Sequence, residues 1–496
     1  MITPSFELFC EKAKEGNLIP VYREILADTD TPVSAFLKIK EGDYSYLLES
    51  VEGGEKWGRF SFMGTSPSII IEGAGSTVDL QEGDHHQRFH NENPLQILKT
   101  VMARFKPVQI EGLPRFTGGA VGLIGYEGVR FFEPSMQFNG TERDQKEIDF
   151  FFMFTDTFLA FDNLKHKIKI VTNAFIENAD IKEAYQKAIE KLDVISARFC
   201  APIKQTINLL STEARQQAIP ATSNMSKDTF IQSVQEAKAL IAAGDIFQVQ
   251  LSQRFSMPIH SDPFTIYRIL RSINPSPYMY YLELGSRHIV GTSPEVLVRL
   301  EGKRAEVRPI AGTRRRGSTV QEDLALEKEL LADPKERAEH IMLVDLGRND
   351  LGRVCEYGSV KVTELMVVER YSHVMHIVSN IIGQLQNNAD SFSLLEACFP
   401  AGTVTGAPKI RAMEIIDALE PEGRGLYAGT VGYFGFDGNM DTCITIRTIV
   451  IENNIATVQA AAGIVADSDP EREYEETVNK AKAMLSALAM AEKGTV

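Results

Sequence analysis

The sequence has few cysteines and a shortage of positive charge, and both features exclude classes of protein. Its 496 residues include five cysteines, and no two of them form a Cys-x-x-Cys pair. Zinc sites and disulfide frameworks use closely spaced cysteines, so reduced thiols in a cytosolic protein are the better expectation. Lys and Arg number 52 against 67 Asp and Glu, a formal net charge of −15. General binding to nucleic acid or to an anionic membrane needs the opposite balance, and neither is expected.

Signals of secretion, membrane insertion and several common enzyme classes are also missing. No run of about 18 apolar residues occurs, and residues 1–17 mix acids and bases around one short apolar patch. We therefore expect a cytoplasmic protein without a membrane span or a cleaved leader. Residues 118–126 are rich in glycine but lack the GxGxxG spacing, which indicates a close-packed strand. The Walker spacing is absent before Lys409, and no GxSxG motif occurs.

Length and element order predict a large α+β protein with two parts. The chain exceeds what one ordinary hydrophobic core holds. Residues 200–226 are polar with weak periodicity, so we place a boundary near residue 220, between parts 1–220 and 221–496. Strands and helices follow one another without regular βαβ alternation. This order predicts large mixed, mainly antiparallel sheets with flanking helices.

Hydrophobic spacing and turn residues predict the individual elements. In the first part we expect strands at 34–39, 44–49, 60–65, 68–72, 150–161 and 167–172, and helices at 94–105 and 181–199. In the second part we expect a strand at 246–255, helices at 226–244, 263–273, 324–352 and 408–419, a hairpin of 442–452 with 455–462, and a last helix from about 470. Asp333-Pro334 is a candidate break in the long helix.

Two pairs of glutamates have the spacing of neighbours on one helix face. Glu336 and Glu339 precede an apolar run, and Glu473 and Glu476 lie in the predicted last helix. Residues three apart point to the same face of a helix. Two such faces brought together could hold a hard cation such as Mg²⁺ through oxygen ligands. Solvated surface acids have the same spacing, so this alternative stays open.

Other segments have the composition of an anion site. The small residues 402–409 lead into a helix, whose amide groups and dipole favour negative charge, and residues 461–463 allow close backbone approach. Arg447 is expected in an apolar strand, beside a core or exposed. Glu295, at the mouth of a strand, could transfer a proton if its pKa is raised. His376 lies in a strand pattern, where a structural histidine is the common alternative.

Taken in order, these motifs resemble one family. The motifs are residues 245–252 (DIFQVQLS), 291–295 (GTSPE), 309–314 (PIAGTR), 345–351 (DLGRNDL) and 399–409 (FPAGTVTGAPK). From about residue 245 to its end, the chain resembles the chorismate-utilising enzymes, whose fold has two intertwined parts. Residues 47–50 and 60–62 are similar to the regulatory half of anthranilate synthase component I.

The resemblance implies roles for the candidate residues. Glu339 and Glu476 would bind Mg²⁺, with Glu336 and Glu473 in support, and Glu295 would be the general acid on the departing 4-hydroxyl of chorismate. The residues implied to hold the substrate are Gly312, Thr313, Tyr427, Arg447, Ala461, Ala462 and Gly463. The residues implied to line the ring are His376, which is also implicated in pyruvate loss, and Thr403. The family commonly has glycine where this chain has Ala461, which weakens the expected backbone approach there.

Two positions bear on which chorismate reaction is catalysed. Relatives that add water have a lysine at the place of Gln248, and aminodeoxychorismate synthases have a nucleophilic lysine at the place of Ala311. Glutamine cannot act as that base. The resemblance therefore implies ammonia as the nucleophile and anthranilate and pyruvate as the products, in the first committed step of tryptophan biosynthesis. Alternatives are an aminodeoxychorismate or aminodeoxyisochorismate synthase and a non-catalytic tryptophan-binding regulator.

The resemblance also implies partners and regulation. No glutaminase domain with a Cys-His-Glu triad is recognisable in the sequence, so a separate glutaminase subunit is expected to supply ammonia within a heterotetramer. Feedback inhibition by tryptophan is implied at Ser50, Pro277, Tyr278 and Met279.

Overall fold

The computed structural model describes residues 2–50, 58–133, 135–136, 148–176, 180–203, 221–371 and 374–494. Residues 204–220, within the predicted linker, lie outside this set, so the boundary near residue 220 stays a prediction. In the described ranges, no helix is long and apolar enough to cross a membrane.

The strands form two large sheets. In spatial order, sheet A consists of β1 (Ile2–Thr3), β2 (Leu18–Leu26), β11 (Lys167–Phe175), β10 (Thr157–Asp162), β4 (Phe60–Thr65), β3 (Tyr44–Glu49), β14 (Tyr278–Leu284), β15 (Arg287–Ser293), β24 (Thr448–Glu452), β25 (Ile455–Ile464), β13 (Gln248–Pro258) and β12 (Thr222–Ser223), with β21 (Gly406–Ala407) beside β13. Sheet B consists of β18 (Ile310–Arg315), β20 (Val374–Gln384), β17 (Arg304–Val307), β16 (Val296–Glu301), β23 (Met440–Ile444), β22 (Thr430–Gly435), β8 (Gly119–Ile124), β9 (Ile148–Phe154), β5 (Ile69–Ala74), β6 (Thr77–Glu82) and β7 (His85–His90), with β19 (Lys361–Arg370) beside β20.

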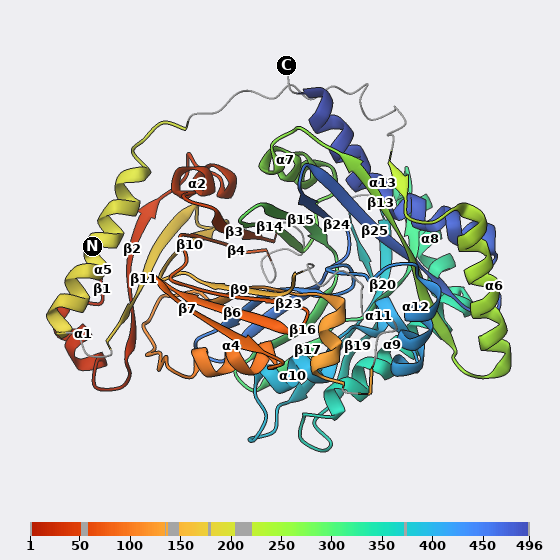
Figure 1. Cartoon of the computed structure of the whole chain (residues 1–496), viewed down its shortest axis with the longest axis horizontal. Helices are drawn as coiled ribbons and strands as arrows, with labels where there is room; N and C mark the ends of the chain where they lie inside the picture. Colours follow the sequence, from red (N-terminus) through yellow and green to blue (C-terminus); the bar gives the residue numbers. More distant parts are fainter. Residues whose placement is uncertain are drawn as a thin grey trace.

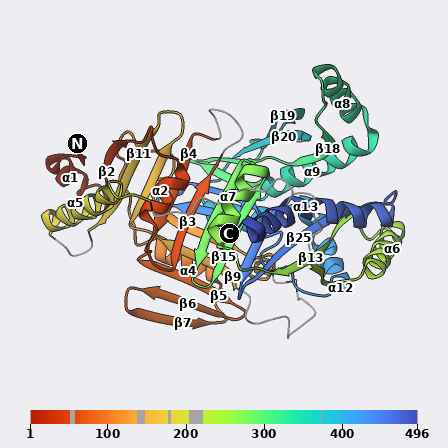
Figure 2. The same ribbon diagram turned by 90° about the horizontal axis from the view of Figure 1, so that it is seen from above.

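Helices flank both sheets (Figure 1). They are α1 (Phe6–Lys12), α2 (Pro32–Ile39), α4 (Pro94–Met102), the 3₁₀ helix η1 (Tyr126–Phe131), α5 (Ile181–Arg198), α6 (Lys227–Ala243), α7 (Pro263–Ile273), α8 (Val320–Ala332), α9 (Pro334–Gly352), α10 (Ser391–Cys398), α11 (Gly402–Thr405), α12 (Lys409–Leu419) and α13 (Pro470–Gly494). Seen from above, α1 and α5 lie at one end of the molecule and α8 at the other (Figure 2).

Each half of the chain contributes a continuous block of strands to each sheet. In sheet A the blocks meet where β3 pairs antiparallel with β14, and in sheet B they meet where β8 pairs with β22. One hydrophobic cluster between the sheets includes Phe62 and Tyr280 of sheet A and Val121 and Tyr433 of sheet B. The prediction of an α+β fold with two intertwined parts and mainly antiparallel sheets is confirmed.

Several predicted helices are confirmed, with local reasons for their ends. Helix α7 has the predicted bounds, and the Asp262 side chain accepts a hydrogen bond from the Thr265 N–H group at its start. The long predicted helix breaks at Asp333, which caps the start of α9 by accepting from the Lys335 and Glu336 N–H groups. Pro334 follows at the first helical position, where its missing N–H group costs nothing.

Residues 34–39 were predicted to form a strand and instead belong to helix α2. Thr31 and Ser34 form a capping box, and Pro32 occupies the first turn. The buried residues Ala35, Phe36 and Ile39 follow helical spacing. Capping therefore overrides the strand preference of the short apolar run.

Two predicted strands are divided between the sheets. Residues 150–154 belong to β9, in sheet B, and residues 157–161 belong to β10, in sheet A. The chain breaks between the two strands at Thr155 and Asp156. Residues 442–452 likewise divide into β23 and β24, so only β24 forms the predicted hairpin with β25. Arg447 lies in this crossing with a φ of +53° and not inside a strand, which corrects its predicted position.

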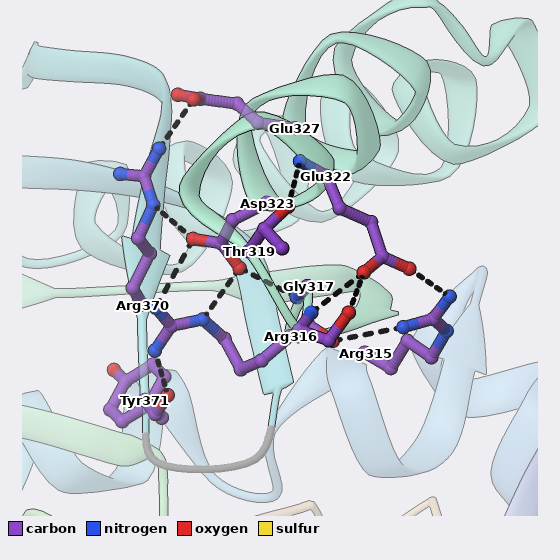
Figure 3. Close-up of polar contacts among 10 residues, drawn as sticks. Arg315, Arg316, Gly317, Thr319, Glu322, Asp323, Glu327, Arg370 and Tyr371 are labelled. Carbon is purple, nitrogen blue, oxygen red and sulfur yellow. Dashed lines mark hydrogen bonds and ion pairs between the residues drawn. The ribbon is translucent and has the colours of Figure 1, made fainter.

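Ion pairs fix helix α8 to β18 and β19 (Figure 3). Asp323 of α8 is buried, and its carboxylate accepts from Arg316 (Nε, 2.9 Å), Arg370 (Nε, 3.1 Å) and the Gly317 N–H group (2.8 Å). The Arg316 hydrogen bond and then that of Gly317 lower the Asp323 pKa to about 2. This network holds the end of β18, the strand that carries residues 312 and 313 of the candidate site.

Candidate active site

Glu295 lies where the chain leaves β15 and enters β16. Its carbonyl accepts a hydrogen bond from the Ile444 N–H group of the neighbouring strand end (3.0 Å), and the Ser293 hydroxyl donates to the Ile444 carbonyl (2.6 Å). The side chain is buried, with 6% of the residue exposed. Burial raises the Glu295 pKa to about 8, although contacts with the Thr403 hydroxyl and the Ile310 N–H group partly oppose this effect. Glu295 is therefore protonated at neutral pH and can donate a proton.

His376 of β20 lies beside a bulge in β18. The register shifts between Ala311 and Thr313, and Gly312 adopts a φ of +73° that favours glycine. His376 Nδ1 lies 3.3 Å from the Gly312 carbonyl oxygen and 2.9 Å from Thr313 Oγ1. A carbonyl can only accept, so Nδ1 is assigned the proton and Nε2 is the basic nitrogen. Burial lowers the His376 pKa to about 4, so the ring is neutral at pH 7.

The first turns of α9 hold Glu336 and Glu339. Arg314 Nη1 binds Glu336 (3.0 Å), and Gln248 Nε2 donates to Glu339 Oε1 (2.9 Å). Burial is the main cause that raises the Glu339 pKa, and the charge of Glu336 adds to it. Gln248 Oε1 is buried and has no hydrogen-bond partner among the described residues.

The first turns of α13 hold Glu473 and Glu476. Glu473 is buried, and burial together with the Glu476 charge raises its pKa. Glu476 is half exposed and pairs with Lys480 Nζ (2.7 Å), which also donates to the Ala461 carbonyl (2.9 Å). The positive charge of Lys480 lowers the pKa values of Glu295, Glu339, Glu473 and His376. These groups come from four elements, and each lies within electrostatic range of Lys480.

Lys480 was not among the residues predicted from the sequence. The sequence does place Lys480 four residues after Glu476 in the predicted last helix. Residues at this spacing can form ion pairs, so the position could have suggested that Lys480 pairs with Glu476. The same spacing is common on exposed helices, and only the fold shows that this ammonium group faces the strand end at Ala461.

The four glutamates predicted to form the metal site lie as two pairs, one on α9 and one on α13. Among the described residues, no three His, Cys, Asp or Glu side chains lie close enough together to hold a metal ion. The charge of Lys335 lowers the pKa values of both Glu339 and Glu473, so the first turn of α9 lies within electrostatic range of Glu473 in α13. The donors are carboxylate oxygens and the buried, unpartnered Gln248 Oε1, and hard cations such as Mg²⁺ prefer this donor chemistry. The residues therefore fit Mg²⁺ by chemistry, and the assignment of four metal-site glutamates stays a prediction.

Of the predicted substrate-binding residues, Ala461, Ala462 and Gly463 lie near the end of β25 with Tyr427 close to Ala461, whereas Gly312 and Thr313 lie on β18. Burial raises the Tyr427 pKa to about 12, and the nearby Ala461 N–H group partly opposes this effect. Ala462 is fully buried opposite Leu251 of β13. A Cβ atom on Gly463 would lie 2.7 Å from Gln248 Nε2, so a side chain here would displace the Gln248 amide.

Arg447 presents a cation at the same edge. Its guanidinium forms no direct hydrogen bond or ion pair with any residue that the structure describes. Burial lowers its pKa, and the charges of Tyr427 and Glu476 oppose that shift. A partly buried guanidinium without a direct partner has its donors available for an anionic ligand.

A cavity separate from the site around Glu295 brings together the four residues predicted to bind tryptophan. Ser50, Pro277, Tyr278 and Met279 line it from the junction of β3 and β14. Its other lining residues include four aromatic and four charged residues, namely Phe60, Phe62, Tyr280, Tyr433, Glu49, Arg115, Arg299 and Asp441. The cavity shares none of the residues named above for the site around Glu295.

Ion pairs form part of the wall of this cavity. Asp441 is buried and binds Arg299 Nη2 and Arg115 Nη2, each at 3.0 Å, and the Tyr278 hydroxyl at 2.8 Å. Glu49 pairs with Arg271 (2.9 Å).

Comparisons with known proteins identify the family of this chain. Residues 45–486 match the model of the chorismate binding enzyme family. This chain belongs to the chorismate binding enzyme family. Anthranilate synthase component 1 of Acetivibrio thermocellus is 49% identical over 490 residues, covering 98% of this chain and 99% of the relative. The protein of the same name from Synechocystis is 49% identical over 506 residues, with 98% and 99% coverage.

Solved structures extend the comparison. The crystal structure of anthranilate synthase component I from Streptococcus pneumoniae has a TM-score of 0.77 and 36% identity, covering 93% of this chain and 99% of that one. The isochorismate synthase MenF from Escherichia coli, at 20% identity and a TM-score of 0.68, covers 98% and 99% and shares the fold. The chain is thus a chorismate-utilising enzyme, as its sequence motifs predicted.

Replacement of Glu295 by glutamine should change both activity and the pH dependence of stability. The variant cannot donate the proton, so turnover should fall by at least about 100-fold. In the wild type the folded-state pKa is raised above the unfolded value, so wild-type stability falls as pH rises from about 4.5 to about 8. Urea unfolding at pH 5 and pH 8 should therefore show the variant gaining stability relative to the wild type at pH 8. An equal difference at both pH values would contradict the raised pKa.

Replacement of Lys480 by methionine should reduce kcat/KM for chorismate by at least about tenfold. The variant loses a cation that faces an anionic substrate and a hydrogen bond to the Ala461 carbonyl. Lys482, exposed on the same helix, provides the control, since Lys482→Met should retain wild-type activity. Equal kinetics of the two variants would remove Lys480 from the site.

Proposed function

We propose that this chain is the large subunit of a cytoplasmic anthranilate synthase. It would convert chorismate and ammonia to anthranilate, pyruvate and water in an Mg²⁺-dependent reaction, the first committed step of tryptophan biosynthesis. Relatives that are 45–49% identical over nearly the whole chain are named anthranilate synthase component 1, which supports this choice among the reactions of the family.

The observation that carries the proposal is the absence of lysine at two positions of the site. Gln248 is 1% exposed, and its amide donates to Glu339, so it cannot accept a proton from water. Ala311 stands opposite Ile377 in the ladder beside His376 and offers no nucleophilic atom. With neither group present, the nucleophile must come from outside the chain, and ammonia fits the names of the relatives.

Glu295 and His376 supply the two proton transfers. Glu295, protonated at pH 7, donates to the 4-hydroxyl, which leaves as water while ammonia forms a bond to C2 of the ring. The ammonium group formed at C2 then loses a proton, which restores the Glu295 acid. The C2–H and C3–O bonds then break, the ring becomes aromatic, and the enolpyruvyl carbon takes up a proton to give pyruvate. The neutral Nε2 of His376 can accept the C2 proton in this second step.

Cationic and backbone groups would hold the carboxylates of the substrate. Arg447, Lys480 and the Tyr427 hydroxyl lie at the end of β25, and Gly463 leaves room for close approach. Glu339 and Glu476 would hold Mg²⁺, with Glu336 and Glu473 in support, and the bound cation would supply Lewis acidity for a substrate carboxylate.

The cavity between the sheets would bind tryptophan as a feedback inhibitor. Phe60, Phe62 and Tyr433 offer apolar walls for an indole ring. Ser50 offers a hydroxyl for the polar end of the amino acid. The name component 1 among the relatives implies a second component, so we also propose a glutaminase partner that supplies ammonia within a heterotetramer.

The product of the reaction tests the proposal directly. The purified chain, incubated with chorismate, Mg²⁺ and ammonium at alkaline pH, should produce fluorescent anthranilate. Glutamine should replace ammonium once the partner subunit is added. Accumulation of aminodeoxychorismate, aminodeoxyisochorismate or isochorismate would reject the assignment of the nucleophile. Absence of every product, with tryptophan still bound, would indicate a non-catalytic regulator.

Tryptophan inhibition should depend on Ser50 and Met279. Ser50→Ala or Met279→Thr should raise the tryptophan concentration for half-inhibition by about tenfold, because each variant loses a contact in the cavity. Activity without tryptophan should stay near the wild-type value. Met257→Thr, at a buried methionine elsewhere in sheet A, controls for general loss of packing. Unchanged inhibition in both cavity variants would refute the site.

A further inference from the structure

His376, the base in the proposed loss of pyruvate, becomes positively charged when it accepts the C2 proton. Its surroundings disfavour this charge, because burial, the largest cause, lowers its pKa to about 4. The positive charges of Arg447 and Lys480 lower the pKa as well. A negative charge beside the ring would therefore favour proton uptake in this step.

Glu369 of β19 supplies a negative charge at this place. It lies directly opposite His376 of β20 in the antiparallel ladder. Side chains of directly opposite residues project from the same face of a sheet, with Cβ atoms about 4.5–5.5 Å apart. The Glu369 charge raises the His376 pKa and so opposes the two cations. On the neighbouring strand β18, the groups next to Nδ1 are the uncharged Gly312 carbonyl and Thr313 hydroxyl.

Two side chains hold the Glu369 carboxylate in place. Arg308 donates to both carboxylate oxygens, with 3.1 Å between Nη1 and Oε2, and the Tyr371 hydroxyl donates to Oε2 (2.9 Å). The Tyr371 ring also packs against the His376 ring, with centroids 5.6 Å apart and an angle of 60° between the planes. The Glu369 side chain is 30% exposed, so solvent screens its charge only in part. The carboxylate is therefore fixed beside the imidazole ring.

Glu364 provides a matched comparison on the same strand. Its carboxylate lies 3.7 Å from Arg308 Nη2, so it shares the cationic partner of Glu369. In the ladder, however, Glu364 is opposite Asn380, four residues beyond His376. Four residues of a strand span about 13 Å. The two glutamates thus differ in their distance from His376, and they share their contact with Arg308.

We propose that Glu369 is a positioning residue that stabilises the imidazolium form of His376 during the loss of pyruvate. In that step His376 Nε2 takes the C2 proton, and the C2–H electrons form the C2=C3 double bond that makes the ring aromatic. The C3–O bond breaks, and its electron pair leaves with the enolpyruvyl oxygen. The enol then takes up a proton at its methylene carbon to give pyruvate. This inference rests on the proposed function.

Single-turnover reactions of the full chain separate the two steps. Excess enzyme is mixed with chorismate, Mg²⁺ and ammonium, and quenched samples are separated by liquid chromatography. Chorismate, anthranilate and the aminated intermediate that keeps its enolpyruvyl group are each followed. In Glu369→Gln the decay of the intermediate should slow by about threefold to tenfold, because the charge opposite His376 is lost. Chorismate should disappear at the wild-type rate.

Further variants distinguish this role from a general effect on the fold. Glu364→Gln should leave both rates at their wild-type values, and Glu369→Asp, which keeps the charge, should restore part of the lost rate. If Glu369→Gln fails to fold, Tyr371→Phe removes one donor to the carboxylate and should slow the same step by a smaller factor.

The outcomes also distinguish this inference from the proposed function. Equal slowing of both steps in Glu369→Gln, or rates equal to those of Glu364→Gln, would overturn the role of Glu369. In either case a wild-type chain that still forms anthranilate would leave the proposed function intact. A wild-type chain that forms neither the intermediate nor anthranilate would reject the proposed function, and this inference with it.

Discussion

The pairing of β16 with β23 is the constraint on which both proposed sites depend. At one end the Ile444 N–H group holds the carbonyl of Glu295, the buried acid of the candidate active site. At the other end Arg299 and Asp441 are cross-strand partners and line the cavity proposed for tryptophan. Strands rise about 3.3 Å per residue, so the two sites lie on the order of 13 Å apart on one ladder. A ligand that shifts the Arg299–Asp441 pair therefore acts on the element that places Glu295.

Burial gives the candidate site an acid and a base that are both uncharged at neutral pH. The Glu295 pKa is raised to about 8 and the His376 pKa is lowered to about 4, in each case mainly because burial disfavours the charged form. One group can give a proton and the other can accept one under the same conditions. Neither repels an anionic substrate, and the positive charge that attracts it comes from Lys480 and Arg447.

Much of the fold follows from local sequence signals, and the site does so only in part. The bounds of α7 and the break at Asp333 were predictable, because capping residues and proline act within one turn. The points near Thr155 and Arg447, where the chain passes from one sheet to the other, were not predictable. The strands on both sides of each point are apolar, and only their pairing with strands far away in the sequence assigns them to different sheets. Family motifs made Glu295 and His376 candidates for the site. The proton position on His376 and the place of Lys480 depend on contacts between elements far apart in the sequence.

The shared sheets also set the order in which the protein can be completed during synthesis. Strand β3 leaves the ribosome early, but its partner β14 begins only at Tyr278, and β8 waits for β22 at Thr430. At usual translation rates the edge of β3 stays unpaired for on the order of 10–45 s. Unpaired edges of apolar strands are templates for association with other chains. Strands β3 and β8 can therefore reach their final pairing only after much of the second half of the chain has been synthesised.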